Sequence, residues 1–368
     1  MADMLAKYDN WLSSDAGPAA LVIREYLVPV EGADGVVFPS TFAAQEGAER
    51  DKSKFQGGYN IDGDPNGKNV CLIDSVGSQA NRIEPIFGKP DYAALVPQIV
   101  VKAGDRAINL LEAGHRAGDA LVRCSALQKE LQDAFKAAQK GNAEPLARIA
   151  PTSLVFGVWD SRDTQAKLPR LIASTIRAFN ARKLTRSAQF VPATQYVEDK
   201  LLEAPDENDK ALKKAYAERG FIHVPASGSH GGIIADGGIR RDATLSLAAL
   251  RLLSTGKDDA KTLALRRYIL GLALTAFTHP PASYLRQGCN LVLDPDKPRE
   301  FIEVHTDGKR VPVQVSHQDA LAYAAAAAKA FGVGKGRTVD FDTKLAVKDV
   351  RGEEIEVEVG RKPAKKQA

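Results

Sequence analysis

Hydrophobic and polar positions along the chain change period from segment to segment, which predicts strands interleaved with helices. Alternation over residues 20–30 predicts a strand, and the apolar run 70–74 predicts a second one. Further short apolar runs predict strands over 153–160, 186–192, 221–225 and 290–294, with a hairpin over 300–315. Apolar residues at helical spacing predict helices over 115–140, 168–181, 242–253, 261–277 and 316–331. This mixture predicts an α+β fold with a mixed or antiparallel sheet.

The segment between the first two strands, residues 31–69, is rich in glycine and has no sustained period. Loops of this length are usually functional or mobile. No clear linker divides the chain, so we expect a single elaborated domain over 1–350. Within it we expect a loop or thumb-like insertion at 31–69 and an acidic helical insertion at 197–220. Residues 351–368 are expected to form a C-terminal strand and a basic tail.

Composition narrows the class of protein. The chain has 368 residues, of which 44% are hydrophobic and 26% charged, values that exclude a disordered chain. Cys71, Cys124 and Cys289 stand far apart, which does not suit a disulfide framework and predicts a reducing, cytoplasmic compartment. The start of the chain lacks the pattern of a signal peptide. The longest apolar stretch, 268–277, is about half of a membrane span, so no membrane partner is expected.

Charge is distributed unevenly although the net charge is only +4. No Asp or Glu occurs between Thr164 and Val197, and the next stretch, 198–209, is rich in acids. A local positive surface matters more to a polyanionic partner than the total charge does. The cations of the first stretch are Lys167, Arg170, Arg177, Arg182, Lys183 and Arg186.

Residues 74–87 predict a helix that begins at Asp74 or Ser75 directly after a strand. At helical spacing, polar side chains gather on the face opposite the apolar stripe. A helix N-terminus bearing hydroxyl groups and a guanidinium favours a phosphate. The alternative is that Ser75 only caps the helix and the other side chains are solvated. The candidate ligands here are Ser75, Ser78, Gln79, Asn81 and Arg82.

The segment 167–186 predicts an amphipathic helix with Lys167, Arg170, Ser174 and Arg177 on one side. Six cations without a nearby acid repel one another, and a polyanion would relieve that repulsion. A plain amphipathic helix remains the alternative. A glycine-rich stretch, 228–238, followed by two arginines, matches neither a dinucleotide fingerprint nor a P-loop. It either forms a hairpin turn or brings backbone close to a sugar-phosphate chain, with His230, Gly231, Gly232, Arg240 and Arg241 beside it.

Enzyme templates find little support. The six histidines show no metal-binding spacing, and neither C-x-x-C nor G-x-S-x-G occurs. We therefore expect no catalytic residue, metal or cofactor. His230 as a general base is a weaker alternative. Another is a metal-dependent ribonuclease that uses loop acids such as Asp62 and Asp64, in a loop that also holds Asp34 and Asp51. A nucleotide-binding metabolic enzyme built on the glycine-rich stretch is a third class.

Six segments in this order resemble one family, the RAMP-superfamily backbone subunit of type I-U (also called I-G) CRISPR effector complexes, a Cas-seven-like protein. The matching segments are FPSTF (38–42), CLIDSVGSQANRIE (71–84), HRAGDALVR (115–123), PTSLVFGVWDSR (151–162), KLPRLIASTIRAFNARKLTRSAQFVP (167–192) and GGIIADGGIRRDATLSLAALRLL (231–253). The resemblance covers the chain from the early loop to about Leu253.

The resemblance implies an RRM-like (ferredoxin-like) palm with large finger- and thumb-like insertions and no catalytic activity. It implies that several copies bind along one CRISPR RNA (crRNA), whose spacer then pairs with a target DNA strand. Family members grip the guide backbone with a Ser/Gln/basic helix start, here Ser75, Ser78, Gln79 and Arg82. They also extend a loop or hairpin over the neighbouring copy's RNA, for which 31–69 is our candidate. Partners implied are crRNA, further copies, a large subunit and a crRNA-processing or end-capping subunit.

Overall fold

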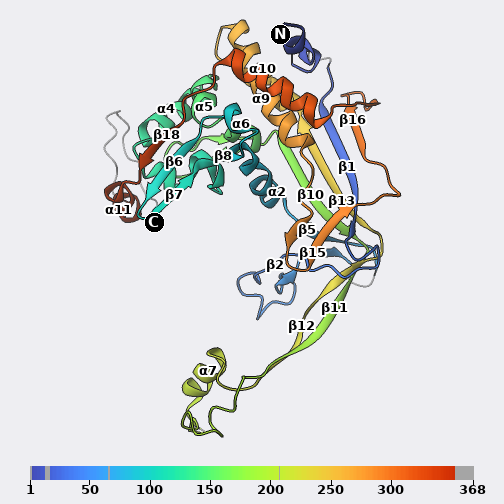
Figure 1. The fold of residues 1–368 in the computed structure, drawn as a ribbon, viewed down its shortest axis with the longest axis vertical. Coiled ribbons are helices and arrows are strands. Elements are labelled where there is room, and N and C mark those ends of the chain that lie inside the picture. The colour runs from blue at the N-terminus through green and yellow to red at the C-terminus, as the bar shows by residue number, and fades with distance from the viewer. Residues whose placement is uncertain (1, 13–16, 65–66, 207, 353–368) are drawn as a thin grey trace.

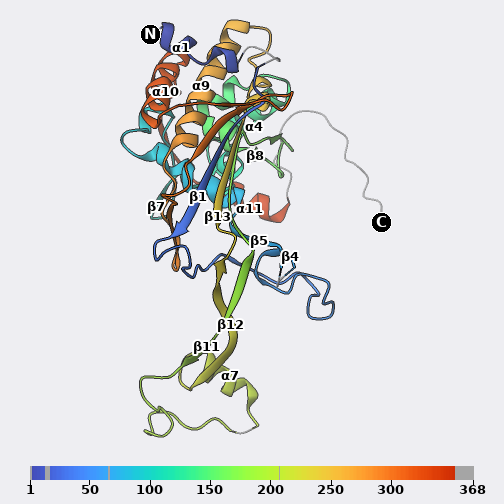
Figure 2. The same ribbon diagram turned by 90° about the vertical axis from the view of Figure 1, so that its right-hand side faces the viewer.

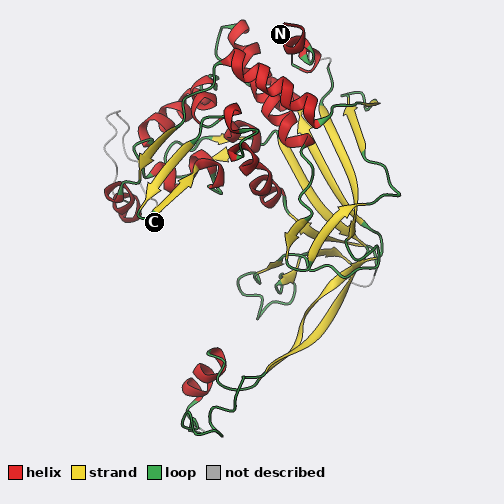
Figure 3. Cartoon of the chain, viewed as in Figure 1, coloured by secondary structure: helices red, strands yellow, loops and turns green. Residues whose placement is uncertain are grey.

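The computed structural model describes residues 2–12, 17–64, 67–206 and 208–352. At its centre lies a long antiparallel sheet with strand order β14-β15-β1-β13-β10-β5-β4, in which β16 also pairs with β1 and β17 with β16 (Figures 1 and 3). The strands are β1 (Ala20–Pro29), β4 (Ile61–Gly63), β5 (Asn69–Asp74), β10 (Ile172–Phe179), β13 (Ile239–Ser246), β14 (Tyr284–Arg286), β15 (Cys289–Leu293), β16 (Glu300–Val304) and β17 (Arg310–Pro312). The α+β class and the antiparallel sheet expected from the sequence are confirmed.

Alternation in β1, β13 and β10 determines which side chains are buried. Leu21, Ile23, Leu245 and Ile172 point to one face and are at most 3% exposed. The opposite face, which we call the open face, carries half-exposed polar and charged side chains such as Arg24, opposite Asp242. One sheet therefore presents an apolar side to the helices and a charged side to solvent.

Helices α9 (Asp259–Thr278) and α10 (His317–Phe331) cover the apolar face, with α8 (Leu247–Arg251) and α1 (Ala2–Ala6) beside them (Figure 1). The ring of Tyr268 stacks on that of Phe331 with centroids 4.7 Å apart. Glycine is required at 271, because a Cβ there would lie 2.7 Å from Cα of Ala324. No helix in the described part of the chain is both long and apolar enough to span a bilayer.

A second group of elements packs beside these helices. It contains α3 (Ala120–Arg123), α4 (Gln128–Gln139), α5 (Glu144–Ile149), α6 (Pro151–Phe156), α11 (Thr343–Arg351) and a sheet formed by β6 (Ile99–Ala103), β7 (Arg106–Asn109) and β18 (Arg337–Asp340). Buried Phe135 and Phe156 belong to the same hydrophobic cluster as Leu265 of α9, so the core is continuous. Helix α2 (Val76–Ile83) lies between this group and the main sheet (Figure 1).

A long hairpin leaves the lower end of the sheet (Figure 2). Its strands are β11 (Ala181–Phe190) and β12 (Val224–Ala235), and its far end carries α7 (Lys210–Glu218), none of whose residues is buried. We call residues 181–235 the arm. The glycine-rich segment 31–69 forms short strands β2 (Thr41–Phe42), β3 (Gly58–Tyr59) and β4, and it pairs with the base of the arm through Val37 and Ile233. The arm is thus the longest projection seen in Figure 1, and 31–69 stays close to the sheet.

The helix predicted over 168–181 is wrong, because these residues form β9 (Lys167–Leu168) and β10. The apolar pair Ile172 and Ile176 is spaced by four residues, which puts both on one side of either a helix or a strand. Burial of Ile172, Ser174, Ile176 and Ala178 follows the period of a strand. β-branched Ile172, Thr175 and Ile176 favour that outcome.

Other boundaries differ for local reasons. Residues expected to begin a helix at Asp242 continue as β13, and Ser246 caps α8 by accepting a hydrogen bond from Ala249 N–H. The strand expected over 153–160 is mostly α6, which Pro151 begins and Gly157 ends, followed by the two-residue strand β8 (Val158–Trp159). The expected helix 115–140 is broken into a 3₁₀ turn, α3 and α4.

The expected strands and helices near 20–30, 70–74, 261–277 and 316–331 are confirmed. The strand and tail expected over 351–368 lie almost entirely outside the described residues.

Candidate nucleic-acid interface

Helix α2 begins immediately after buried strand β5, and Ser75 is its N-cap. The Ser75 hydroxyl accepts a hydrogen bond from Ser78 N–H at 3.2 Å, and Gln79 N–H donates the first helical bond to Ser75 O. The N–H groups of Val76 and Gly77 precede that bond, so the helix itself offers them no acceptor. Together with the positive end of the helix dipole, they form a site suited to an anion.

Arg170 reaches this helix start from the connection between β9 and β10. A Cβ placed on Gly77 would lie 4.0 Å from Nη2 of Arg170 and 4.0 Å from Oγ of Ser75, so the guanidinium and the hydroxyl converge there. Within the described residues, Arg170 makes no hydrogen bond to an acceptor and no ion pair. We call Ser75, Gly77, Ser78 and Arg170 the α2 site. Its hydroxyls, amides and uncompensated positive charge are the groups that bind phosphate.

The second positive charge behind the α2 site belongs to Arg116, which is 4% exposed. Its Nε lies 2.6 Å from Glu84 Oε2, and its other nitrogens donate to Asn81 Oδ1 at 3.2 Å and Gly157 O at 3.3 Å. Burial, and then the charge of Arg116, lower the pKa of Arg170. An anion bound at the α2 site would offset that unfavourable environment.

Gly157 lets Arg170 take this position. A Cβ on Gly157 would lie 2.5 Å from Cγ of Arg170, and its φ of 77° is in the left-handed region. Neither Arg116 nor Gly157 is predicted from the sequence as a site residue, since both act through contacts between segments distant in the chain.

One residue predicted on α2, Gln79, and one predicted in the segment 167–186, Ser174, serve the fold. Gln79 is 5% exposed, donates to Asp74 Oδ2 at 2.5 Å and accepts from Ser174 Oγ at 3.0 Å. Ser174 is itself buried on β10. Arg82 pairs with Asp74 at 3.2 Å and keeps its side chain one-third exposed. Asn81 is exposed at the surface, so Asn81 and Arg82 remain candidate contacts, whereas Gln79 and Ser174 are not accessible to a ligand.

On the open face, Arg240 and Arg24 share one carboxylate, whereas Arg177 has a hydrogen bond but no ion pair among the described residues. Arg240 lies opposite Arg177, stacks over the Phe179 ring at 4.7 Å and pairs with Asp242 at 2.9 Å. Asp242 also pairs with Arg24 at 3.3 Å. Arg177 donates to Thr175 Oγ1 at 2.6 Å. Because Ser174 and Arg177 point to opposite faces of a strand, the single cationic side predicted for 167–186 does not exist.

Arg241 points to the helix-covered face, where it is 2% exposed and pairs with Glu25 at 2.5 Å. Glu25 also pairs with Arg299 at 3.2 Å. The prediction that Arg241 contacts a ligand is therefore wrong. Its partner comes from a strand 216 residues earlier in the chain, so sequence spacing could not reveal it.

At the base of the arm, Arg182 and Lys183 are exposed, and Arg182 pairs with Asp236 at 3.3 Å. Arg186 lies over the Phe38 ring at 5.8 Å. The ring of His230 meets that of Tyr59 edge-on at 4.9 Å. Gly231 and Gly232 let strands approach, since a Cβ on them would lie 2.8 Å from Thr185 C and 2.4 Å from Val36 Cγ1 respectively. A turn at 235–238 joins β12 to β13, but the two strands pair in different sheets, so the hairpin expected as the alternative does not form.

The acids proposed for the ribonuclease alternative lie near the sheet edge, where Asp62 and Asp64 are exposed. In the described ranges no three His, Cys, Asp or Glu side chains gather closely enough to hold a metal ion.

Comparison with known proteins gives a family match over the residues that build the α2 site. Residues 21–183 match the family described as "CRISPR-associated protein GSU0053 (Cas_GSU0053)". A chain of a solved structure titled "CRISPR RNA-guided surveillance complex, pre-nicking" aligns with 90% of this chain and 98% of its own length, at 12% identity and a TM-score of 0.32. No curated protein matches the chain. The family match confirms the resemblance to a CRISPR-associated protein over residues 21–183.

Proposed function

We propose that this chain is a non-enzymatic backbone subunit of a type I-U/I-G CRISPR interference complex, in which several copies bind along the crRNA spacer and present it for pairing with target DNA. The family match over 21–183 supports the CRISPR context. The antiparallel sheet with helices on one face suits the RRM-like palm that the resemblance implies. The other expected partners, a large subunit and a crRNA-processing subunit, belong to the same proposal.

The observation that carries the proposal is the α2 site. Arg170 has no acidic partner among the described residues and converges with Ser75 on the N-terminus of α2. Such a site recognises a phosphate and reads no base, because phosphate and sugar are common to every sequence. A guide scaffold needs this property, since pairing with the target must read the spacer while its base edges stay free.

The arm supports assembly into several copies. Its base is cationic, but residues 198–209 near its end carry Glu198, Asp199, Glu203, Asp206, Glu207 and Asp209 against a single lysine. An acidic segment repels RNA, so we assign residues 198–209 to contact with protein, namely a neighbouring copy. This replaces 31–69 as our candidate for the extension toward that copy, because 31–69 packs against the base of the arm.

The proposal is tested by isolating the protein with its CRISPR locus expressed and sequencing the co-purifying nucleic acid. We expect RNA of uniform length carrying a repeat-derived end. In binding assays with unrelated single-stranded RNAs, Arg170→Ala should weaken all of them equally, by about tenfold for one charge-assisted contact. Arg310→Ala, an exposed arginine on β17, is the matched control. Absence of RNA, or a loss confined to one sequence, would contradict the proposal.

Assembly is tested separately by shortening the arm. Phe190 lies opposite Val224, so residues 191–223 can be replaced by an Asn-Gly turn that closes β11 onto β12. We expect unchanged thermal stability, because α7 has no buried residue. Affinity for a short RNA should persist, whereas cooperative binding to an RNA long enough for several copies should disappear. Retained cooperativity would assign assembly to another surface.

A further inference from the structure

The chain has two tryptophans in very different surroundings. Trp11 is 2% exposed, and its indole N–H donates to Glu303 at 2.8 Å. Trp159 is 59% exposed on strand β8. An indole left in water loses the free energy of burial, about 25 cal/mol for each Å² of apolar surface. The Trp159 ring is not part of the hydrophobic core, so any role it has lies at the surface.

Trp159 is held in a defined position by its strand partner. It lies opposite Lys167 in the β8–β9 hairpin, and the Lys167 Nζ lies 5.5 Å from the ring centroid. Lys167, predicted from its charge, thus places a cation over one face of the exposed ring. An aromatic ring beside a cation is suited to stack on a nucleobase while the cation attracts the adjoining phosphate.

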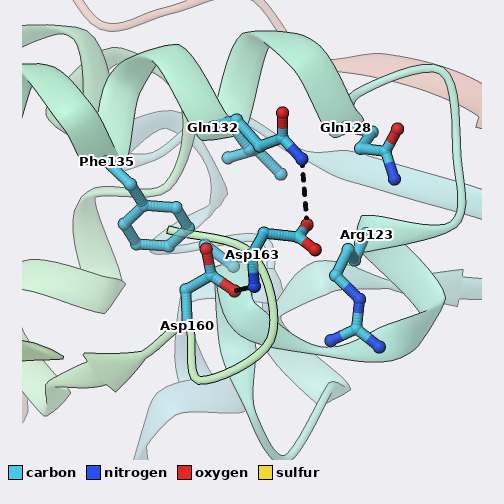
Figure 4. A pocket seen from close by; sticks show the side chains of 8 residues that line it. Arg123, Gln128, Gln132, Phe135, Asp160 and Asp163 are labelled. Atoms are coloured by element: carbon cyan, nitrogen blue, oxygen red, sulfur yellow. Dashed lines mark hydrogen bonds between the residues drawn. The ribbon is translucent and has the colours of Figure 1, made fainter. Parts of the chain in front are cut away.

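The loop that joins the two strands of this hairpin, residues 160–166, is held in place by hydrogen bonds within the loop and from α4 (Figure 4). Asp160 is 3% exposed and accepts hydrogen bonds from Asp163 N–H at 3.3 Å, Thr164 N–H at 2.9 Å and Thr164 Oγ1 at 2.6 Å. Gln132 of α4 donates to Asp163 at 3.1 Å (Figure 4). A ring on a rigid hairpin loses little entropy when it binds, which favours a preformed stacking surface.

The same hairpin leads directly to the α2 site. Gly157, in contact with Arg170, precedes Trp159 by two residues, about 7 Å of extended strand. Lys167 precedes Arg170 by three residues along the chain. The phosphate-binding arginine and the exposed indole are therefore displayed by one short, braced segment.

We propose that Trp159 is a stacking platform for a nucleobase of the single-stranded RNA whose phosphate binds at the α2 site. This inference rests on the proposed function and adds a contact to the base, which none of the polar residues above supplies. Stacking accepts every base because each has a π face, so it leaves binding independent of sequence.

The test uses the full chain and two synthetic RNAs of equal length, one of mixed sequence and one with abasic riboses throughout. We expect the mixed RNA to quench the fluorescence of Trp159, with no quenching by the abasic RNA. Trp159→Ala should weaken the mixed RNA by about tenfold and leave the abasic RNA unaffected, and Trp159→Phe should restore most of the affinity. Tyr284→Ala, which removes another exposed aromatic ring, is the matched control and should bind as the unaltered chain does.

Separate outcomes distinguish this inference from the function on which it rests. Equal quenching by both RNAs, or unchanged binding of mixed RNA by Trp159→Ala, would overturn the stacking role. If Arg170→Ala weakened the binding of both RNAs, that result would still support a phosphate site at the start of α2. Because Trp159 is exposed, circular dichroism should show the variants folded, and a quenching signal that depends on protein concentration without RNA would assign the ring to a protein contact instead.

Discussion

The α2 site and the open face of the sheet both carry arginines, yet their charges have different environments. On the open face, Arg24 and Arg240 share Asp242, with N–O distances of 3.3 and 2.9 Å. At the α2 site, Arg170 meets hydroxyls, amides and the positive charge of Arg116, but no described carboxylate. A polyanion gains little from an arginine that must first leave its own acid. The comparison indicates that pairing with a nearby acid, rather than the number of cations in a segment, distinguishes the arginines available to an anion from those that are not.

The largest effect is expected on the stability of the fold, at the buried arginine Arg241. Arg241→Ala leaves Glu25 buried with only Arg299 near it, which should cost about 3–5 kcal/mol of the free energy of unfolding. Urea denaturation measures this loss. Replacing both partners, as Glu25→Gln with Arg241→Met, should recover part of it. If Arg241→Ala left the stability unaltered but weakened RNA binding, Arg241 would have to contact RNA, contrary to this account.

A substitution at Ser75 should separate folding from binding. Aspartate caps a helix as well as serine does and suits the positive end of the dipole, so Ser75→Asp should preserve thermal stability. Its carboxylate would occupy Arg170 and repel phosphate, lowering RNA affinity by about fivefold or more, because two charges 4 Å apart interact by about 1 kcal/mol even in water. Fluorescence anisotropy with labelled RNA measures the affinity. Ser316→Asp, at the cap of α10, is the control, and equal losses in both variants would refute a local effect.

The smallest effect is expected on the open face. Arg240→Ala removes one member of a partly exposed network in which Asp242 keeps Arg24, so the loss of stability should be at most about 1 kcal/mol. RNA affinity should stay within about twofold of the unaltered chain, since a compensated arginine offers a phosphate little. Thermal denaturation and anisotropy measure the two quantities. A loss as large as that of Arg170→Ala would mean that RNA also crosses the open face.

The sequence contained enough information for the class of fold, the first strands, the long helices and the Ser75 cap, because each depends on local pattern. The helices predicted over 168–181 and from Asp242 are wrong for most of these residues, which form strands. Apolar residues spaced by four positions fit a helix and a strand alike. The predicted helix also placed Ser174 on the same side as Arg177, whereas strand β10 directs these two side chains to opposite faces. Glu25 determines the surroundings of Arg241 through the pairing of β1 with β13, which no spacing rule reveals. Arg240 and Asp242 are two residues apart on β13, so their ion pair follows once these residues are recognised as a strand. Trp159 was not predicted, because its exposure and its place opposite Lys167 depend on the β8–β9 pairing, which the apolar pattern of 153–160 did not indicate.

The salt dependence of RNA binding by Arg170→Ala and Arg240→Ala tests the central claim most directly. The logarithm of the association constant falls linearly with the logarithm of salt concentration, by about 0.7 for each phosphate contact on a single strand. We predict a slope shallower by about 0.7 for Arg170→Ala on every RNA sequence, and an unchanged slope for Arg240→Ala. An unchanged slope for Arg170→Ala, or the same reduction in both variants, would contradict a phosphate site at the start of α2.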